Sequence, residues 1–578
     1  MQTWRARGIR FMHRVHARRA ARADLTTRFV SPPEPYMIGS VQRGQQLLRG
    51  DFLFSGLRIE NPALSVWDIA DSHPDIADEI HSCGWLEDLA AVGDEAARNT
   101  AQTWANQWID RYGDGRRQGW LPELVGRRLI RWISHGEFLL RGQDRVRRNR
   151  LLTSLAQQSL FLSRRWSVMP AGLPRFAALA GTIHAGLSLD GLAPIARTAV
   201  QALTLDCDNQ IDRDGGIAPR NPEALLDLLT LLNWTTHTLR QTGQPVPTSL
   251  HRAVERVAPT LRALRHADGG LARFHGGGRG MEGRLDLALA ASGVKDLPGP
   301  GLHMGFARLG GGRTTLIVDA AAPPTGPASA NAHASTLAFE LTSGRRPLIV
   351  NCGSGIRFGP EWQRASRATP SHSTLALTGV SSSQLAPTQR GQMGQEWLCK
   401  TPTLVRGALA RKSNRTLELS HNGYQPHNGL THARILTLSA DGRILEGEDL
   451  LTTLNDADNA LFDKAMAGTD GKGIAWAVRF HLHPDVRAAI DDAAATVQLT
   501  LISGETWVFR QDGAAKMDLT QSVYLENGQL TPTKTQQVVL SGRSLAYATR
   551  VRWSLAKAQD TPDVLRDLVQ ADPMDRIK

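Results

Sequence analysis

The chain has 578 residues, of which 41% are hydrophobic and 21% are charged. These proportions are typical of folded globular proteins and exclude a disordered or collagen-like chain. The formal net charge is +12, but residues 1–28 alone hold eight arginines against one aspartate, so more than half of the excess lies in that segment. Because the rest of the chain is only mildly basic, the charge does not require a nucleic acid partner, and we expect none.

The first 40 residues are expected to form a basic extension. Its apolar residues stand among the arginines: Trp4, Ile9, Phe11, Met12 and Val15. This pattern fits either a loose terminal arm or a basic amphipathic helix that contacts an anionic membrane surface. Arginines interrupt every apolar run, so we expect neither a secretory signal nor a membrane span of about 18 apolar residues. The missing signal favours the cytoplasm.

Apolar residues recur at helical spacing from about residue 84 to 266, between breaks at Gly, Pro and Asp. The expected helices are 86–111, 122–141, 146–164, 174–187, 191–205, 222–241 and 248–265. We therefore predict a helical domain over residues 41–290.

A glycine-rich stretch, 267–300, is expected to be the linker to a second domain or the inter-domain crossing. From His303 onward the chain consists of short runs with period-two alternation and β-branched residues, such as TTLIVDA, TLELSHNGY and TVQLTLI. Turn residues separate these runs. The pattern predicts a large antiparallel β-sandwich over residues 301–556, followed by a polar tail, 557–578.

Three motifs in the β half occur in a fixed order. NAHASTLAFEL begins at Asn331, GRRPLIVNCG contains Asn351, and RATPSHST begins at Arg367. Together they resemble the heparinase II/III-like polysaccharide lyases, in which a His-rich loop leads into an LSFEL strand, then a VDPG-like strand end, then an R-x-T-x-x-HNT element. The resemblance covers most of residues 85–555.

The resemblance implies an incomplete α/α toroid joined to the β-sandwich. It also implies β-elimination of an acidic, uronate-containing polysaccharide in the cleft between toroid and sandwich. That reaction needs a base for the C5 proton, an acid for the leaving glycosidic oxygen and a clamp that neutralises the uronate carboxylate. Lyases of this family are typically exported to the periplasm or cell envelope.

The candidate site residues follow from the resemblance and from side-chain chemistry. The catalytic candidates are Tyr424, His184 and Asn331. The substrate-binding candidates are Arg367, His421 and His481. The metal-binding candidates, carried over from the family for a structural zinc ion, are His333, His372 and Asn351. Each has an ordinary alternative, because buried histidines and arginines often serve only the core.

The sequence departs from the family pattern at four positions of the expected site. Ala224 stands where the family has a tyrosine, Leu187 where it often has a glutamate one turn after its Asn-His pair, Asn331 where it has the first His of an H-x-H pair, and Asn351 where it has an aspartate. A neutral amide is a weaker ligand for a divalent cation than a carboxylate. These departures leave open a catalytically degenerate carbohydrate-binding or scaffold protein of the same fold. A toroid glycoside hydrolase is a third alternative, and it would need paired carboxylates across the cleft.

Overall fold

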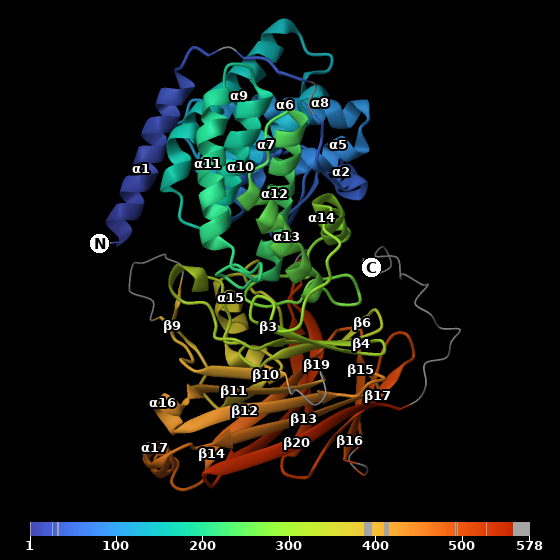
Figure 1. Cartoon of the computed structure of the whole chain (residues 1–578). Helices are drawn as coiled ribbons and strands as arrows, with labels where there is room; N and C mark the ends of the chain where they lie inside the picture. The colour runs from blue at the N-terminus through green and yellow to red at the C-terminus, as the bar shows by residue number, and fades with distance from the viewer. Residues whose placement is uncertain are drawn as a thin grey trace. The chain divides into compact units, whose positions relative to one another are not determined.

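The computed structural model describes residues 2–558, with gaps at 26, 32–33, 38, 387–395, 410–414, 492, 494 and 527–528. The chain divides into two compact units, which we call unit 1 and unit 2 (Figure 1). Unit 1 comprises Met1–Ile217, Leu226–Ala258 and Ala288–Val294, and unit 2 comprises Ala218–Leu225, Pro259–Leu287 and Lys295–Lys578. Helices build unit 1 and antiparallel strands build most of unit 2, so the predicted fold class is confirmed.

The basic N-terminus forms a helix. α1 spans Gln2–Ala21, contacts α9 (Arg145–Arg165) and buries His13, Ala17 and Ala20. The guanidinium of Arg165 donates a hydrogen bond from Nε to Nδ1 of His13 over 3.1 Å. Of the two forms expected for this segment, the loose arm is therefore wrong.

Unit 1 contains a small hairpin and a succession of helices. The hairpin pairs β1 (Asp51–Phe54) with β2 (Leu57–Glu60). The further helices are α2 (Val41–Leu48), α3 (Val66–Ser72), α4 (Pro74–His81), α5 (Trp85–Val92), α6 (Glu95–Tyr112), α7 (Pro122–Ser134), α8 (Gly136–Leu140), α10 (Leu173–Ser188), α11 (Ala193–Gln210), α12 (Pro222–Gln241), α13 (Thr248–Ala263) and α14 (Arg284–Ser292). α12 begins in unit 2, and α13 and α14 also cross the division between the units.

Local signals set several helix ends. The side chain of Asp94 caps α6, because it accepts a hydrogen bond from the backbone N–H of Ala97 over 2.7 Å. α7 and α12 begin at Pro122 and Pro222, and proline suits a first turn, where its missing N–H would have no helical partner.

The core of unit 1 depends on a close helix crossing and a buried cation. A Cβ added to Gly181 on α10 would lie 2.4 Å from the Cα of Gly126 on α7, so the two glycines let these helices approach. The fully buried guanidinium of Arg128 lies 3.9 Å from the centre of the Trp108 ring and donates to Oε1 of Gln158 over 2.7 Å. Its remaining N–H groups donate to two backbone carbonyls, so this buried charge is satisfied.

Unit 2 is a sandwich of two eight-stranded sheets within the described residues. The first sheet has the order β10 (Val405–Leu409), β11 (Thr416–Tyr424), β12 (Leu430–Leu438), β13 (Ile444–Thr452), β20 (Ala548–Lys557), β17 (Thr506–Gln511), β16 (Thr496–Thr500) and β15 (Arg487–Asp491). The second has the order β18 (Lys516–Tyr524), β19 (Thr533–Ser544), β14 (Ile474–Leu482), β6 (Arg346–Val350), β5 (Phe339–Ser343), β4 (Thr314–Asp319) and β3 (Phe306–Gly311), with β7 (Leu375–Leu377) paired to β14. Short elements include α15 (Pro360–Ser366), α16 (Gln425–Asn428), α17 (Asp456–Ala467), and the two-stranded pair β8 (Gln384–Leu385) and β9 (Leu398–Lys400).

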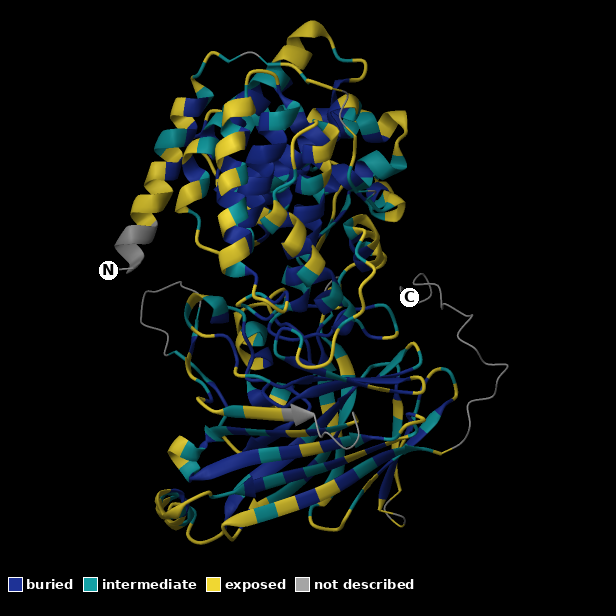
Figure 2. Ribbon diagram, in the orientation of Figure 1, coloured by how far each residue is buried: buried dark blue, intermediate teal, exposed yellow. Residues whose placement is uncertain are grey.

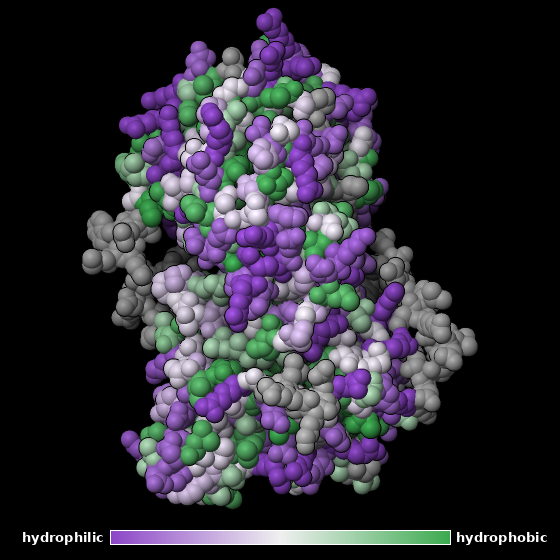
Figure 3. Space-filling view, in the orientation of Figure 1, coloured by the Kyte–Doolittle hydropathy of each residue, from purple (hydrophilic) through white to green (hydrophobic). Residues whose placement is uncertain are grey.

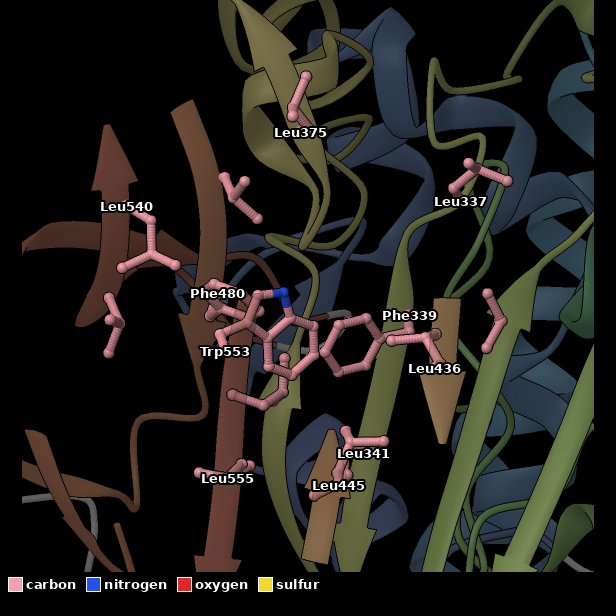
Figure 4. Packing of buried hydrophobic residues seen from close by; sticks show 14 of the residues in the cluster. Leu337, Phe339, Leu341, Leu375, Leu436, Leu445, Phe480, Leu540, Trp553 and Leu555 are labelled. Carbon is pink, nitrogen blue, oxygen red and sulfur yellow. The ribbon is translucent and has the colours of Figure 1, made fainter. Parts of the chain in front are cut away.

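Aromatic rings fill the centre of the sandwich (Figure 4). Trp553 on β20 stacks on Phe339 of β5, with ring centres 5.9 Å apart, and Phe480 of β14 meets the same indole edge-on at 4.7 Å. Gly447 on β13 stands opposite Trp553, where an added Cβ would lie 2.1 Å from the indole. The glycine therefore makes room for the tryptophan between the sheets.

The outer face of the first sheet is accessible to solvent and carries charged residues beside the exposed Ile435 and Ile444. Buried and solvent-accessible residues alternate along much of β20, as strand geometry requires when one face is covered (Figure 2). In the space-filling view of the whole molecule, hydrophilic residues are interspersed with smaller hydrophobic areas (Figure 3). Among the helices of the described residues, none is long and apolar enough to cross a membrane.

Part of the glycine-rich stretch expected to be a linker belongs to unit 2. Arg273 donates from its backbone N and from Nε to the two carboxylate oxygens of Glu340 on β5, over 3.0 and 3.2 Å. Both side chains are buried, and His266 contacts the same carboxylate at 3.1 Å. This buried ion pair ties 259–287 to the sandwich, so that part of the stretch is not a simple linker. The chain passes between the units at Leu287–Ala288 and at Val294–Lys295, within the stretch expected to hold the inter-domain crossing.

Candidate functional site

Two histidines of the predicted metal set face each other inside unit 2. Nδ1 of His333 lies 3.0 Å from Nε2 of His372, and both rings are buried. Nδ1 of His372 lies 2.9 Å from the carbonyl of Ala368, which can only accept, so that nitrogen carries the proton. Nε2 of His372 is therefore the acceptor, and His333 donates to it.

Both imidazoles are neutral in the folded protein. Burial lowers the pKa of His372 to about 4. Burial, and secondarily the neighbouring His372, hold the pKa of His333 well below its usual value. Each ring therefore keeps one lone pair at neutral pH, but that of His372 Nε2 already accepts the His333 proton, so both facing nitrogens can bind one ion only when that proton moves to Nε2 of His333.

The third predicted ligand, Asn351, suits a metal less well. Zn–N bonds of about 2.0–2.1 Å place two ligand nitrogens roughly 3.3 Å apart, so the spacing of His333 and His372 is compatible with a shared ion. The Asn351 Oδ1, however, already accepts a hydrogen bond from the Ser373 N–H over 3.0 Å, and its buried Nδ2 has no hydrogen-bond partner among the described residues. No group of three or more His, Cys, Asp or Glu side chains in the described residues is arranged to hold a metal ion. The two imidazoles of His333 and His372 are suitable zinc ligands, but the Asn351 amide is not a suitable third ligand. Zinc binding at this site stays a prediction.

The buried carboxylate of Asp319 lies near the His333–His372 pair and positions it through His275. Asp319, at the end of β4, accepts hydrogen bonds from Ser335 Oγ over 2.7 Å and from Arg220 Nη2 over 2.5 Å, and His275 Nε2 lies 3.4 Å away. Burial alone would raise the pKa of Asp319, but Arg220 and His275 outweigh it and hold the pKa well below its usual range. Nδ1 of His275 accepts from the backbone N–H of His333 over 3.2 Å, so Asp319 orients the loop through His275.

Sequence reasoning missed Arg220, His275 and Asp319. Arg220 has a positive φ of 51° and donates to four backbone carbonyls besides Asp319. Backbone acceptors leave no sequence signal. His275 lies in the glycine-rich stretch, 58 residues before His333, where no motif marks it.

Arg367, the predicted carboxylate clamp, is committed to the backbone. Its guanidinium donates to the carbonyls of Ser329, Ala332 and Glu396, each over 2.8 Å, and the side chain is buried. These bonds fix the loop that carries Asn331, which is only partly buried and lies against Gly276. The clamp role of Arg367 and the catalytic role of Asn331 stay predictions.

His421 belongs to a buried chain of hydrogen-bonded side chains that ends on the Asp449 carboxylate. His432 donates from Nε2 to Asp449 over 2.7 Å, and its Nδ1 lies 3.3 Å from Nε2 of His421. The N–H of Gly423 donates to His421 Nδ1 over 3.0 Å, so every ring nitrogen has a partner. Asp449 also pairs with Arg434 through both carboxylate oxygens, at 2.7 and 3.1 Å.

Tyr424 and His481 are also held inside unit 2. The Tyr424 hydroxyl is fully buried and donates to the carbonyl of Leu375 over 2.9 Å, and burial raises the pKa of this phenol. His481 lies 2.7 Å from Ser522 Oγ through Nδ1 and 3.0 Å from the Pro370 carbonyl through Nε2. Burial lowers its pKa to about 3.

Ser373 connects several of these candidates. Its backbone N–H donates to Asn351, its hydroxyl accepts from the N–H of His481, and its carbonyl accepts from Arg434. The segment 368–375 therefore gathers His372, and through hydrogen bonds Asn351, His481 and Tyr424, into one region of unit 2.

His184 lies in unit 1, on α10. Nδ1 is 3.1 Å from Thr238 Oγ1 and 3.3 Å from the Tyr36 hydroxyl, and Nε2 is 3.3 Å from Ser134 Oγ. Burial lowers the pKa of His184 to about 3. Tyr36, which sequence reasoning did not single out, also stacks on Trp234. His184 is thus a satisfied core histidine, and its predicted catalytic role stays untested.

Comparisons with known proteins agree on the family. The family model described as heparinase II/III-like, C-terminal, matches residues 296–554. FtsZ-localized protein C of Caulobacter vibrioides is 32% identical over 535 residues, which are 89% of this chain and 88% of that protein.

Solved structures share the fold of the whole chain. A crystal structure of heparinase III superposes with a TM-score of 0.67 at 12% identity, covering 93% of this chain and 88% of that one. A mutant of the heparan sulfate lyase HepC from Pedobacter heparinus gives a TM-score of 0.57 at 14% identity, covering 96% and 89%. The helical half and the sandwich thus have the architecture of polysaccharide lyases, and the chain belongs to the heparinase II/III-like family.

Proposed function

We propose that this protein is a catalytically degenerate member of its family that works as a scaffold recruited to FtsZ. The observation that carries the proposal is the 32% identity, along 89% of the chain, to a relative named for its localisation to FtsZ. A match of that extent includes both units, so the whole chain is the proposed scaffold.

The environment of the predicted catalytic groups supports a role without turnover. The polar atoms of Tyr424, His481 and Arg367 form hydrogen bonds with other groups inside unit 2. A substrate that recruited one of them would break those bonds, and a buried polar group left unpaired costs about 1–3 kcal/mol. Such side chains stabilise the sandwich and are poorly placed to exchange protons with a polymer.

Co-sedimentation with FtsZ polymers tests the scaffold. The purified chain is expected to pellet with FtsZ when GTP induces assembly and to stay in the supernatant when GDP replaces GTP. A chain that stays in solution under both conditions contradicts recruitment by direct binding.

A second candidate function is a lyase that cleaves an acidic, uronate-containing polysaccharide. The fold and the neutral His333–His372 pair favour it, since an imidazole with a free lone pair can act as a base. Incubation with heparan sulfate, hyaluronan, alginate and bacterial uronate polymers, followed by absorbance of the unsaturated product, is expected to give no signal. Product formation that His333→Gln abolishes would establish the lyase and contradict the proposal of a catalytically degenerate scaffold. Binding of one polymer without product would make that polysaccharide the partner of the scaffold.

Peripheral membrane contact through α1 is part of the proposal. Ile9, Phe11 and Met12 are exposed on this basic helix, and Phe11 is 63% exposed. Apolar side chains among arginines suit an anionic lipid surface. Flotation with anionic vesicles is expected to fail for Phe11→Ser and to persist for the control Leu205→Ser, an equally exposed residue of α11. Equal flotation of both variants contradicts contact through Phe11.

A further inference from the structure

The outer face of the first sheet of unit 2 carries an open groove of about 470 Å³. Its lining comes from four adjacent strands, β12, β13, β20 and β17. None of the sequence motifs falls here, and the groove lies on the face of the sheet opposite to the aromatic core. It is therefore separate from the histidine region described above.

One row of side chains crosses the groove. The strand register places Thr437 opposite Glu446, Glu446 opposite Ser554, and Ser554 opposite Arg510. Directly opposed residues of antiparallel strands point to the same face. The inward neighbours of this row include Trp553, so the row itself faces outward.

The charges of this row are exposed to solvent and are not paired with each other. Neither Glu446 nor Arg510 has a hydrogen-bond or ion-pair partner within the described part of the chain, and both are exposed. The next row differs, because Arg552 donates to the Glu448 carboxylate over 2.6 Å. The small Ser554 separates Glu446 from Arg510, so the two opposite charges stand on either side of a low floor.

We propose that this groove binds a short zwitterionic peptide, whose ammonium group pairs with Glu446 and whose carboxylate pairs with Arg510. Strands are about 4.8 Å apart, so the backbones that carry the two charges are about 9.6 Å apart. An extended tripeptide spans about 10 Å at about 3.3 Å per residue. The hydroxyl group of Ser554, on the floor between the two charges, offers a hydrogen bond to a peptide amide.

Calorimetric titration of the full chain with triglycine tests the site. Saturable binding is expected at low salt, and N-acetyl-triglycine and triglycine amide, which each lack one terminal charge, are expected to bind more weakly. Glu446→Gln and Arg510→Gln should each weaken binding about fivefold, as expected for an exposed ion pair. The controls Glu418→Gln and Arg550→Gln remove the same charges from exposed positions of the same sheet outside the groove, and should leave the affinity unchanged.

Several results would overturn the proposal. They are the absence of saturable heat, equal binding of the blocked peptides, and equal losses in the groove and control variants. Heat from an acidic oligosaccharide but none from triglycine would assign the groove to a glycan. Concentration-dependent dimerisation that Arg510→Gln abolishes would assign it to a second copy of the chain. All of these outcomes are independent of recruitment to FtsZ.

Discussion

Acidification is expected to destabilise both units, because each contains buried neutral histidines. Burial lowers the pKa of His81 and His184 in unit 1 to about 3, and the pKa of His372 and His481 in unit 2 to about 4 and about 3. In an unfolded chain an imidazole has a pKa of about 6.5. Between these values the unfolded chain binds protons that the folded chain excludes. Stability is therefore full above about pH 6.5 and is lost progressively as the pH falls.

The size of the loss follows from the same values. For each histidine, moving from pH 7.5 to pH 5.5 removes about 1.4 kcal/mol from the free energy of unfolding. Two such residues in each unit remove about 3 kcal/mol per unit, a large share of the roughly 5–15 kcal/mol that stabilises a typical domain.

Urea unfolding followed by circular dichroism at the two pH values measures this loss. The midpoint is expected to fall markedly at pH 5.5, and His481→Gln, which cannot titrate, should reduce the pH dependence of unit 2 by about 1.4 kcal/mol. Equal stability at pH 7.5 and pH 5.5 would show that these histidines are protonated in the folded chain and would refute the reasoning.

Three further outcomes are expected. Gly447→Ala would push a methyl group into the indole of Trp553, so the thermal midpoint of unit 2 should fall by an amount equivalent to about 1–3 kcal/mol. The control Gly310→Ala places its methyl group in open space and should change the midpoint little. Equal effects of the two substitutions would contradict the packing argument. Asp449→Asn leaves the buried Arg434 without its carboxylate partner and should lower the free energy of unfolding, measured in urea, by about 3–5 kcal/mol. Near-native stability of this variant would contradict a structural role for the pair. Added zinc should raise the thermal midpoint by binding to His333 and His372. Replacing either histidine with glutamine should remove this effect. No shift of the midpoint with zinc would argue against the metal site.

Much of the fold was predictable because local patterns decide it. The helix expected over 222–241 coincides with α12, and the run TLELSHNGY coincides with β11, since the apolar spacing and the bounding turns are both clear. The strands β18 and β19 were not predicted. Few of their residues are buried, so polar side chains interrupt the alternation that marks a half-buried strand.

The candidate site was predictable only where a motif carries it. The order of the three motifs identified the family, and it drew attention to His333 and His372, which lie 3.0 Å apart. The supports of that pair come from distant single residues, such as Asp319, and no spacing rule links them. The backbone bonds of Arg367 were equally hidden, because a carbonyl acceptor is the same in every residue.

The division of the chain into interleaved units has a consequence for any attempt to isolate the sandwich. A fragment that began at residue 296, where the family match starts, would lack Arg220 and Arg273. Asp319 and Glu340 would then lie buried without their cations, and each would favour unfolding or take up a proton. The sandwich is thus encoded by three separate pieces of the gene, and a soluble version of it has to carry 218–225 and 259–287 along with the strands.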